Sequence, residues 1–117
     1  MTYEDVLLFV TKWGEGTQPG QEKRTPREVW DALGGDALED AVALAAFDTA
    51  LVMGLQRTLD WLEMCQHSGD PRVTVKAILA MREARCRSNK LFSVFGKEWL
   101  TRLTELKRES DALLPPT

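Results

Sequence analysis

The sequence predicts an all-α fold, a helical bundle of about five helices around a long central antiparallel hairpin. Apolar residues recur along most of the chain at the three- and four-residue spacing of helices. No run alternates between apolar and polar residues, as a half-buried strand would. Residues that cap helices stand where this periodicity starts and stops. With 117 residues, 44% of them apolar, we expect one helical domain, 1–117, with its own core.

The first helix is predicted over residues 3–13. Thr2 and Asp5 have the spacing of a capping box, and an apolar stripe of helical period follows until Gly14. Residues 14–24 contain three Gly, one Pro and no apolar residue. Such a composition favours a turn or loop over a packed element. We therefore expect residues 14–24 to form a flexible loop.

Four more helices are predicted from their start signals and apolar periodicity. The sequence TPRE at 25–28 combines an N-cap threonine, a first-turn proline and a glutamate, which predicts a short helix over 26–33. A long apolar pattern predicts a helix over 37–67, and an Asp-Pro pair starts the next, which should run to about residue 95. A last helix is predicted over 97–113. The helix over 37–67 and its successor should form the central hairpin.

Two positions within these helices are irregular. Gly54 and the alanines before it would allow another helix to cross closely between residues 50 and 54. The apolar stripe drifts around Ser88 and Asn89, which predicts a bend there, and Gly96 is the predicted stop of that helix. We expect a helix crossing at the first position and a bend at the second.

No cofactor, metal or membrane span is predicted. Cys65 and Cys86 fall about four helical turns apart on consecutive helices, too far for a disulfide, and should be free thiols of a cytoplasmic protein. Cys65 and His67 form the only close pair of soft metal ligands, and no second pair follows at zinc-site spacing. No apolar run approaches the roughly 20 residues of a transmembrane helix.

Catalytic motifs are also absent from the sequence. It contains no Gly-rich phosphate loop, no nucleophile elbow and no histidine motif on a helix. We therefore expect no catalytic residues, no enzymatic activity and no small-molecule substrate.

The charges of the chain are divided between its two parts. Residues 1–70 carry five basic and thirteen acidic side chains, a net charge of −8, whereas residues 71–117 carry ten and five, a net charge of +5. The total is −3 and the isoelectric point is about 5.2. This separation favours association between unlike faces, either of two copies or of this chain and another protein.

The basic residues concentrate on the helix that begins at residue 71. A helical projection gathers its apolar residues on one side, namely Val73, Ala77, Ile78, Met81, Ala84, Leu91, Phe92 and Phe95. The projection places Arg72, Lys76, Arg87 and Lys90 opposite, as candidate partner-binding or nucleic-acid-binding residues. Arg82 and Arg85 fall nearer the core, where Asp60 and Glu63 of the preceding helix are the expected ion-pair partners.

Trp30 is the remaining candidate site residue. It lies on the shortest predicted helix, beside the loop over 14–24. An exposed tryptophan at such a place would be a natural interface anchor. The other three tryptophans are expected to pack in the core.

Residues 59–96, LDWLEMCQHSGDPRVTVKAILAMREARCRSNKLFSVFG, resemble the helical hairpin of phage small terminase subunits. The shared pattern is a helix, a short GD turn, a second helix with alanine and arginine, and a terminal glycine. It covers about a third of the chain. In that family the hairpin contributes to ring assembly, and an N-terminal helix-turn-helix contacts DNA.

The predicted function is that of a non-catalytic interaction or assembly module. The protein should act through protein–protein contacts, by self-association or by docking on a larger protein. The alternative is a nucleic-acid-binding or phage DNA-packaging subunit, as the terminase resemblance implies. The acidic isoelectric point and the lack of aromatic residues among the outward cations favour the first.

Overall fold

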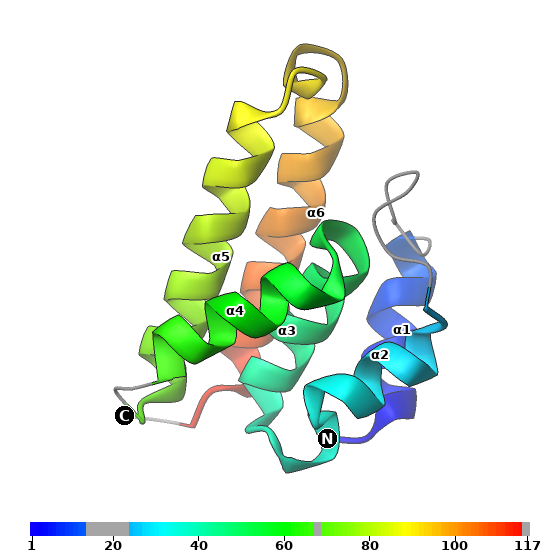
Figure 1. Ribbon diagram of the computed structural model, residues 1–117, viewed down its shortest axis with the longest axis vertical. Helices are drawn as coiled ribbons and strands as arrows, with labels where there is room; N and C mark the ends of the chain where they lie inside the picture. Colours follow the sequence, from blue (N-terminus) through cyan, green and yellow to red (C-terminus); the bar gives the residue numbers. More distant parts are fainter. Residues whose placement is uncertain (14–23, 67–68, 116–117) are drawn as a thin grey trace.

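The computed structural model describes residues 1–13, 24–66 and 69–115, and it confirms the all-α fold (Figure 1). The described elements are α1 (Tyr3–Trp13), α2 (Pro26–Leu33), the 3-10 helix η1 (Gly35–Ala37), α3 (Asp40–Met53), α4 (Leu55–Cys65), α5 (Pro71–Ser88) and α6 (Phe92–Leu113). No strand occurs in these ranges. The predicted flexible loop over 14–24 lies, except for its last residue, outside the described residues.

Local capping chemistry starts the first two helices where the sequence predicts. The Thr2 hydroxyl accepts from the Asp5 amide at 3.3 Å, and Asp5 accepts from the Thr2 amide at 3.1 Å. Thr25 and Glu28 form the same reciprocal capping box at the start of α2. Each box satisfies backbone donors that the first turn of a helix leaves unpaired. Both helices therefore have the predicted bounds.

The helix α3 occupies the centre of the molecule. Thirteen of its fourteen residues are buried, and it contacts each of the other five α-helices. Figure 1 shows α5 and α6 side by side on one flank of α3, α1 and α2 on the other, and α4 across the front. A helix that is apolar on every side is stable only when neighbours cover it all round.

The prediction of one continuous helix over 37–67 is wrong, because the chain turns at Gly54 between α3 and α4. This residue has φ 99° and ψ 145°, a conformation that side chains with a Cβ rarely adopt. The Thr58 hydroxyl donates to the Gly54 carbonyl at 2.9 Å and helps to start α4. The turn directs α4 onto α5. Residue 67, the predicted helix end, lies outside the described residues.

The predicted end of the following helix is also wrong. The helix α5 ends at Ser88, where a bend was expected, and the Asn89 side chain accepts from the Leu91 amide at 2.8 Å in the turn. Gly96 lies inside α6 rather than ending a helix. A Cβ at Gly96 would come within 2.7 Å of the Phe92 ring, so glycine is needed there for packing. The long hairpin of the structure therefore consists of α5 and α6.

Trp30 lies in the core and is not a surface anchor. Its side chain is fully buried, and its ring packs edge-on against Phe47 of α3 with centroids 5.6 Å apart. The indole Nε1 donates to Asp36 at 3.1 Å. Gly35 lies against the ring, where a Cβ would come within 2.3 Å. The prediction of an exposed Trp30 failed because α2 turns its apolar side, Val29, Trp30 and Leu33, toward α3.

Candidate functional site

The most unusual feature of the core is an aspartate held between two arginines. Asp48 of α3 is fully buried. Arg82 of α5 donates from Nη1 to Asp48 Oδ2 at 2.8 Å and to Thr49 Oγ1 at 3.2 Å. Arg102 of α6 donates from Nε to Asp48 Oδ2 at 3.2 Å and from Nη2 to Oδ1. Asp48, Arg82 and Arg102, here called the Arg–Asp–Arg cluster, thus join the three central helices.

The electrostatic state of the cluster follows from opposing effects on Asp48. Burial by itself raises the pKa of the Asp48 carboxyl, because a dry environment disfavours its charge. The charges and hydrogen bonds of Arg82 and Arg102 act in the other direction and prevail, so the pKa of Asp48 is lowered. Asp48 is therefore ionised at neutral pH. The cluster holds two guanidinium groups and one carboxylate.

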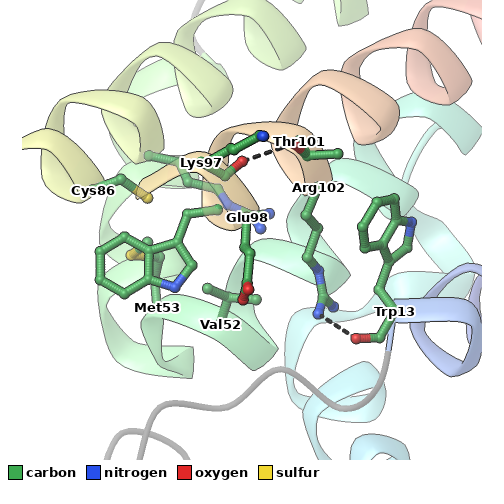
Figure 2. Close-up of a pocket in the computed structure, with 10 residues that line it drawn as sticks. Trp13, Val52, Met53, Cys86, Lys97, Glu98, Thr101 and Arg102 are labelled. Carbon is green, nitrogen blue, oxygen red and sulfur yellow. Dashed lines mark hydrogen bonds between the residues drawn. The ribbon is translucent and has the colours of Figure 1, made fainter. Parts of the chain in front are cut away.

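A cavity of about 580 Å³ adjoins the cluster and is drawn in Figure 2. Arg82 and Arg102 both line it. Its other lining residues are Trp13, Val52, Met53, Cys86, Lys97, Glu98, Trp99 and Thr101. Burial raises the pKa of the Cys86 thiol. A neutral thiol adds to the apolar wall that Val52 and Met53 provide.

Two donors at this cavity lack a protein acceptor. Arg82 Nε and Trp13 Nε1 are both buried and, within the described part of the chain, have no hydrogen-bond partner. Buried polar atoms are nearly always hydrogen-bonded in native proteins, so such atoms require an explanation. In the described ranges, one other buried side-chain atom also lacks a hydrogen-bond partner, namely Ser110 Oγ.

The predicted basic residues do not form one site. Arg72 is half-buried and donates to the Pro115 carbonyl. Lys76 is exposed, one turn further along α5. Arg87 and Lys90 lie at the other end of α5, roughly 20 Å from Arg72 by the rise of an α-helix. Among these four residues, Arg72 and Lys76 therefore form one group and Arg87 and Lys90 another.

Arg87 and Lys90 belong to a compact surface at the turn between α5 and α6. We call Arg85, Arg87, Lys90, Leu91, Val94 and Phe95 the hairpin tip; all six are exposed. Leu91 is 52% exposed and Val94 68% exposed. Arg87 pairs with Glu83 at 2.9 Å and lies over the Phe92 ring, 5.4 Å from its centroid. Cations and apolar side chains are thus adjacent on this surface.

The predicted partners of Arg82 and Arg85 are wrong. Arg82 pairs with Asp48 instead of Asp60 or Glu63, and Asp60 accepts from Gln56 at 3.0 Å. Arg85 is exposed. The sequence projection places Arg82 on the flank of this helix, whereas in the structure Arg82 lies on the buried side of α5. That side consists of Thr74, Val75, Ile78, Leu79, Arg82 and Cys86.

Sequence reasoning missed Asp48, Arg102 and the cavity. One available signal was Asp48 itself, a single acid within the apolar run AVALAAFDTALVM. A helix without a polar face must bury such an acid, and a buried charge requires a partner. Its partners, at positions 82 and 102, are too distant in sequence for any local pattern to reveal them.

The described residues also bear on three other kinds of feature, namely a metal site, reactive thiols and a membrane-spanning helix. In residues 1–13, 24–66 and 69–115, no three His, Cys, Asp or Glu side chains come together as a metal site would require. His67 lies outside these ranges. Cys65 and Cys86 are buried free thiols. None of the described helices is both long and apolar enough to cross a membrane.

Comparison with known proteins gives no relative for this arrangement. No family model, no curated protein and no solved structure matches the chain. The resemblance to small terminase subunits therefore stays a prediction from the sequence pattern.

Proposed function

We propose that this protein is a non-catalytic helical module that self-associates, with the hairpin tip of one copy bound to the acidic end of another. The observation that carries the proposal is the composition of the hairpin tip. Of the six large apolar side chains that are strongly exposed in the described chain, three lie within residues 91–95. Scattered exposed apolar residues are ordinary, whereas a cluster rimmed by charge is typical of an interface.

The charges of the molecule supply the complementary surface. Three cations, Arg85, Arg87 and Lys90, lie at the same turn, and Arg85 and Lys90 line one surface hollow together with Leu91. Four exposed acids lie near the starts of α1 and α3, namely Glu4, Asp5, Asp36 and Glu39, and we call them the acidic end. In Figure 1 the starts of α1 and α3 lie at the bottom, whereas the turn between α5 and α6 lies at the top. Opposite charges at opposite ends favour head-to-tail contact, which produces rings or filaments.

Light scattering tests this contact. At low salt the wild type should have an apparent mass well above the 13.2 kDa of one chain. That mass should fall as added salt shortens the Debye length from about 10 Å at 0.1 M to about 3 Å at 1 M. The double variant Leu91→Ser/Val94→Ser should be monomeric at every salt concentration. The control Met64→Ser/Val73→Ser changes two apolar side chains that are also exposed but lie outside the hairpin tip, and should associate like the wild type.

A complementation experiment tests the head-to-tail geometry. Glu4→Lys reverses a charge at the acidic end and should weaken association, as the tip variant does. A mixture of the two variants should form a heterodimer, because each supplies the surface that the other lacks. Undiminished self-association of Glu4→Lys, with no heterodimer in the mixture, would favour tip-to-tip dimers. A wild type that is monomeric under all conditions would leave docking on a different protein.

The DNA-binding alternative is tested by the exposed cations. Lys76→Gln, Arg87→Gln and Lys90→Gln together should leave folding almost unchanged, since surface substitutions alter stability by roughly 0.5 kcal/mol or less each. Arg72 is kept because it bonds the Pro115 carbonyl. We expect the wild type to show no binding to duplex DNA at 0.15 M salt in a fluorescence anisotropy titration. Tight binding that the triple variant loses would instead support the DNA-packaging function.

A further inference from the structure

We infer that the cavity beside the Arg–Asp–Arg cluster binds a small carboxylate with an apolar body. This inference is independent of the proposed self-association, and it departs from the sequence-based expectation that no small molecule is bound. The cavity lies between α3, α5 and α6, and the end of α1 closes one side. Its volume of about 580 Å³ falls within the range of roughly 300 to 1,000 Å³ that is common for ligand pockets.

The polar part of the ligand is indicated by the donors that lack acceptors. Arg82 is only 1% exposed, yet its Nε has no hydrogen-bond partner in the described chain. Its Nη1 already donates to Asp48 and Thr49, and Arg82 lines the cavity. Trp13 Nε1 is the second donor in this state. A ligand that accepts from Arg82 Nε would remove a buried unsatisfied donor, which otherwise costs free energy.

The charge of the ligand follows from the surroundings of these donors. Arg82 and Arg102 line the cavity and Asp48 lies behind them, paired with both. Lys97 and Glu98 add one charge of each sign to the lining. The excess of positive charge favours an anion there over a neutral molecule of equal shape. A carboxylate oxygen can accept from Arg82 Nε, and a carboxylate carries a single negative charge. A phosphate has more charge and further terminal oxygens, for which this donor alone provides no match.

The apolar part of the ligand is indicated by the opposite wall. Val52, Met53 and Cys86 are buried and turn their side chains to the cavity, as Figure 2 shows. Trp99 packs against them and adds an aromatic surface. A hydrophobic chain or ring would bury its surface here while its carboxylate meets Arg82. An aromatic carboxylate combines both features.

The test uses 2-naphthoate as the probe and its uncharged amide, 2-naphthamide, as the comparison. In ¹⁵N–¹H NMR spectra, 2-naphthoate should shift the Arg82 Nε–H and Trp13 indole N–H signals. The Trp30 indole signal should stay in place, because that group is buried elsewhere and bonded to Asp36. The amide should bind at least roughly tenfold more weakly, since it lacks the charge that meets a guanidinium group. Equal binding of both probes, or no shift at any concentration, would overturn the inference.

Substitution of the arginines is a poor test, because each one holds the buried Asp48. The exposed Glu98 provides a better variant, since its carboxylate lies at the same cavity and should repel the probe. Glu98→Gln should therefore strengthen 2-naphthoate binding by roughly two- to fivefold, in keeping with the modest strength of exposed charge interactions. It should leave 2-naphthamide binding unchanged. Glu63→Gln, an exposed change on α4, is the control and should alter neither. An unchanged 2-naphthoate affinity in Glu98→Gln would exclude this cavity as the binding site.

Discussion

Asp48→Asn is expected to lower the free energy of unfolding by about 3–5 kcal/mol, because it leaves two buried guanidinium groups without their shared counter-charge. Asn has nearly the same size as Asp, so the loss reports on charge rather than on packing. Urea unfolding followed by circular dichroism measures the effect. Asp60→Asn is the matched control: it changes an exposed aspartate on α4 and should cost less than about 0.5 kcal/mol.

The same cluster predicts a dependence of stability on pH. The pKa of Asp48 is lowered in the folded protein from its ordinary value of 3.8. The stabilisation it supplies is therefore complete above pH 3.8 and is lost as the pH falls below that value through the folded pKa. The difference in free energy of unfolding between the wild type and Asp48→Asn should therefore become smaller as the pH falls below 3.8. A difference that stays constant down to pH 2 would contradict the assignment.

Simultaneous replacement of the cluster should behave differently from a single change. The triple variant Asp48→Leu/Arg82→Met/Arg102→Leu removes all three charges and fills their space with apolar side chains. Because desolvation of buried charges offsets much of their attraction, this variant should recover most of the stability that Asp48→Asn loses. A triple variant as unstable as Asp48→Asn would contradict this expectation, because it would show that apolar side chains at the three positions do not replace the ion pairs.

Trp30→Ala is expected to lower the free energy of unfolding by about 3–5 kcal/mol, the usual cost of removing a large aromatic side chain from a core. Thermal or urea unfolding of the variant measures this loss. A stable Trp30→Ala protein that no longer associates would instead support the predicted role of Trp30 as a surface anchor.

A second change tests the contact of Trp30 with Gly35. In the wild type, Gly35→Ala should be destabilising, because its Cβ would come within 2.3 Å of the Trp30 ring. In the Trp30→Ala background the same change should cost much less, since the obstructing ring is gone. The two costs, compared in a double-mutant cycle, should differ clearly. Equal costs would mean that Gly35 is required for a reason other than the tryptophan.

The sequence by itself determined the helix starts that depend on neighbouring residues. The capping boxes at Thr2 and Thr25 and the Asp70–Pro71 start satisfy backbone groups within a few residues of the chain. Such interactions act in the same way wherever the helix later packs. The all-α fold and the bounds of α1 and α2 could therefore be predicted correctly.

Only the tertiary structure decided how far the long helices run. Gly54 tolerates both a continuous helix and a turn, and the turn prevails because it directs α4 onto α5. Gly96 could equally have ended a helix or continued one. It lies inside α6, where a Cβ would be 2.7 Å from the Phe92 ring, and α6 runs on because it packs along α3 and α5. Helical periodicity is the same in both outcomes, so the local pattern could not distinguish them.

The candidate site was also decided by the tertiary structure. Arg82 and Arg102 are separated from Asp48 by 34 and 54 positions, and in isolation each arginine favours water. Burial of a guanidinium group is tolerated only when its counter-charge is buried at the same place. That condition depends on three helices meeting at one point, which no segment of the chain specifies alone. Local chemistry thus set the helices, whereas long-range packing decided which charged groups became part of the core.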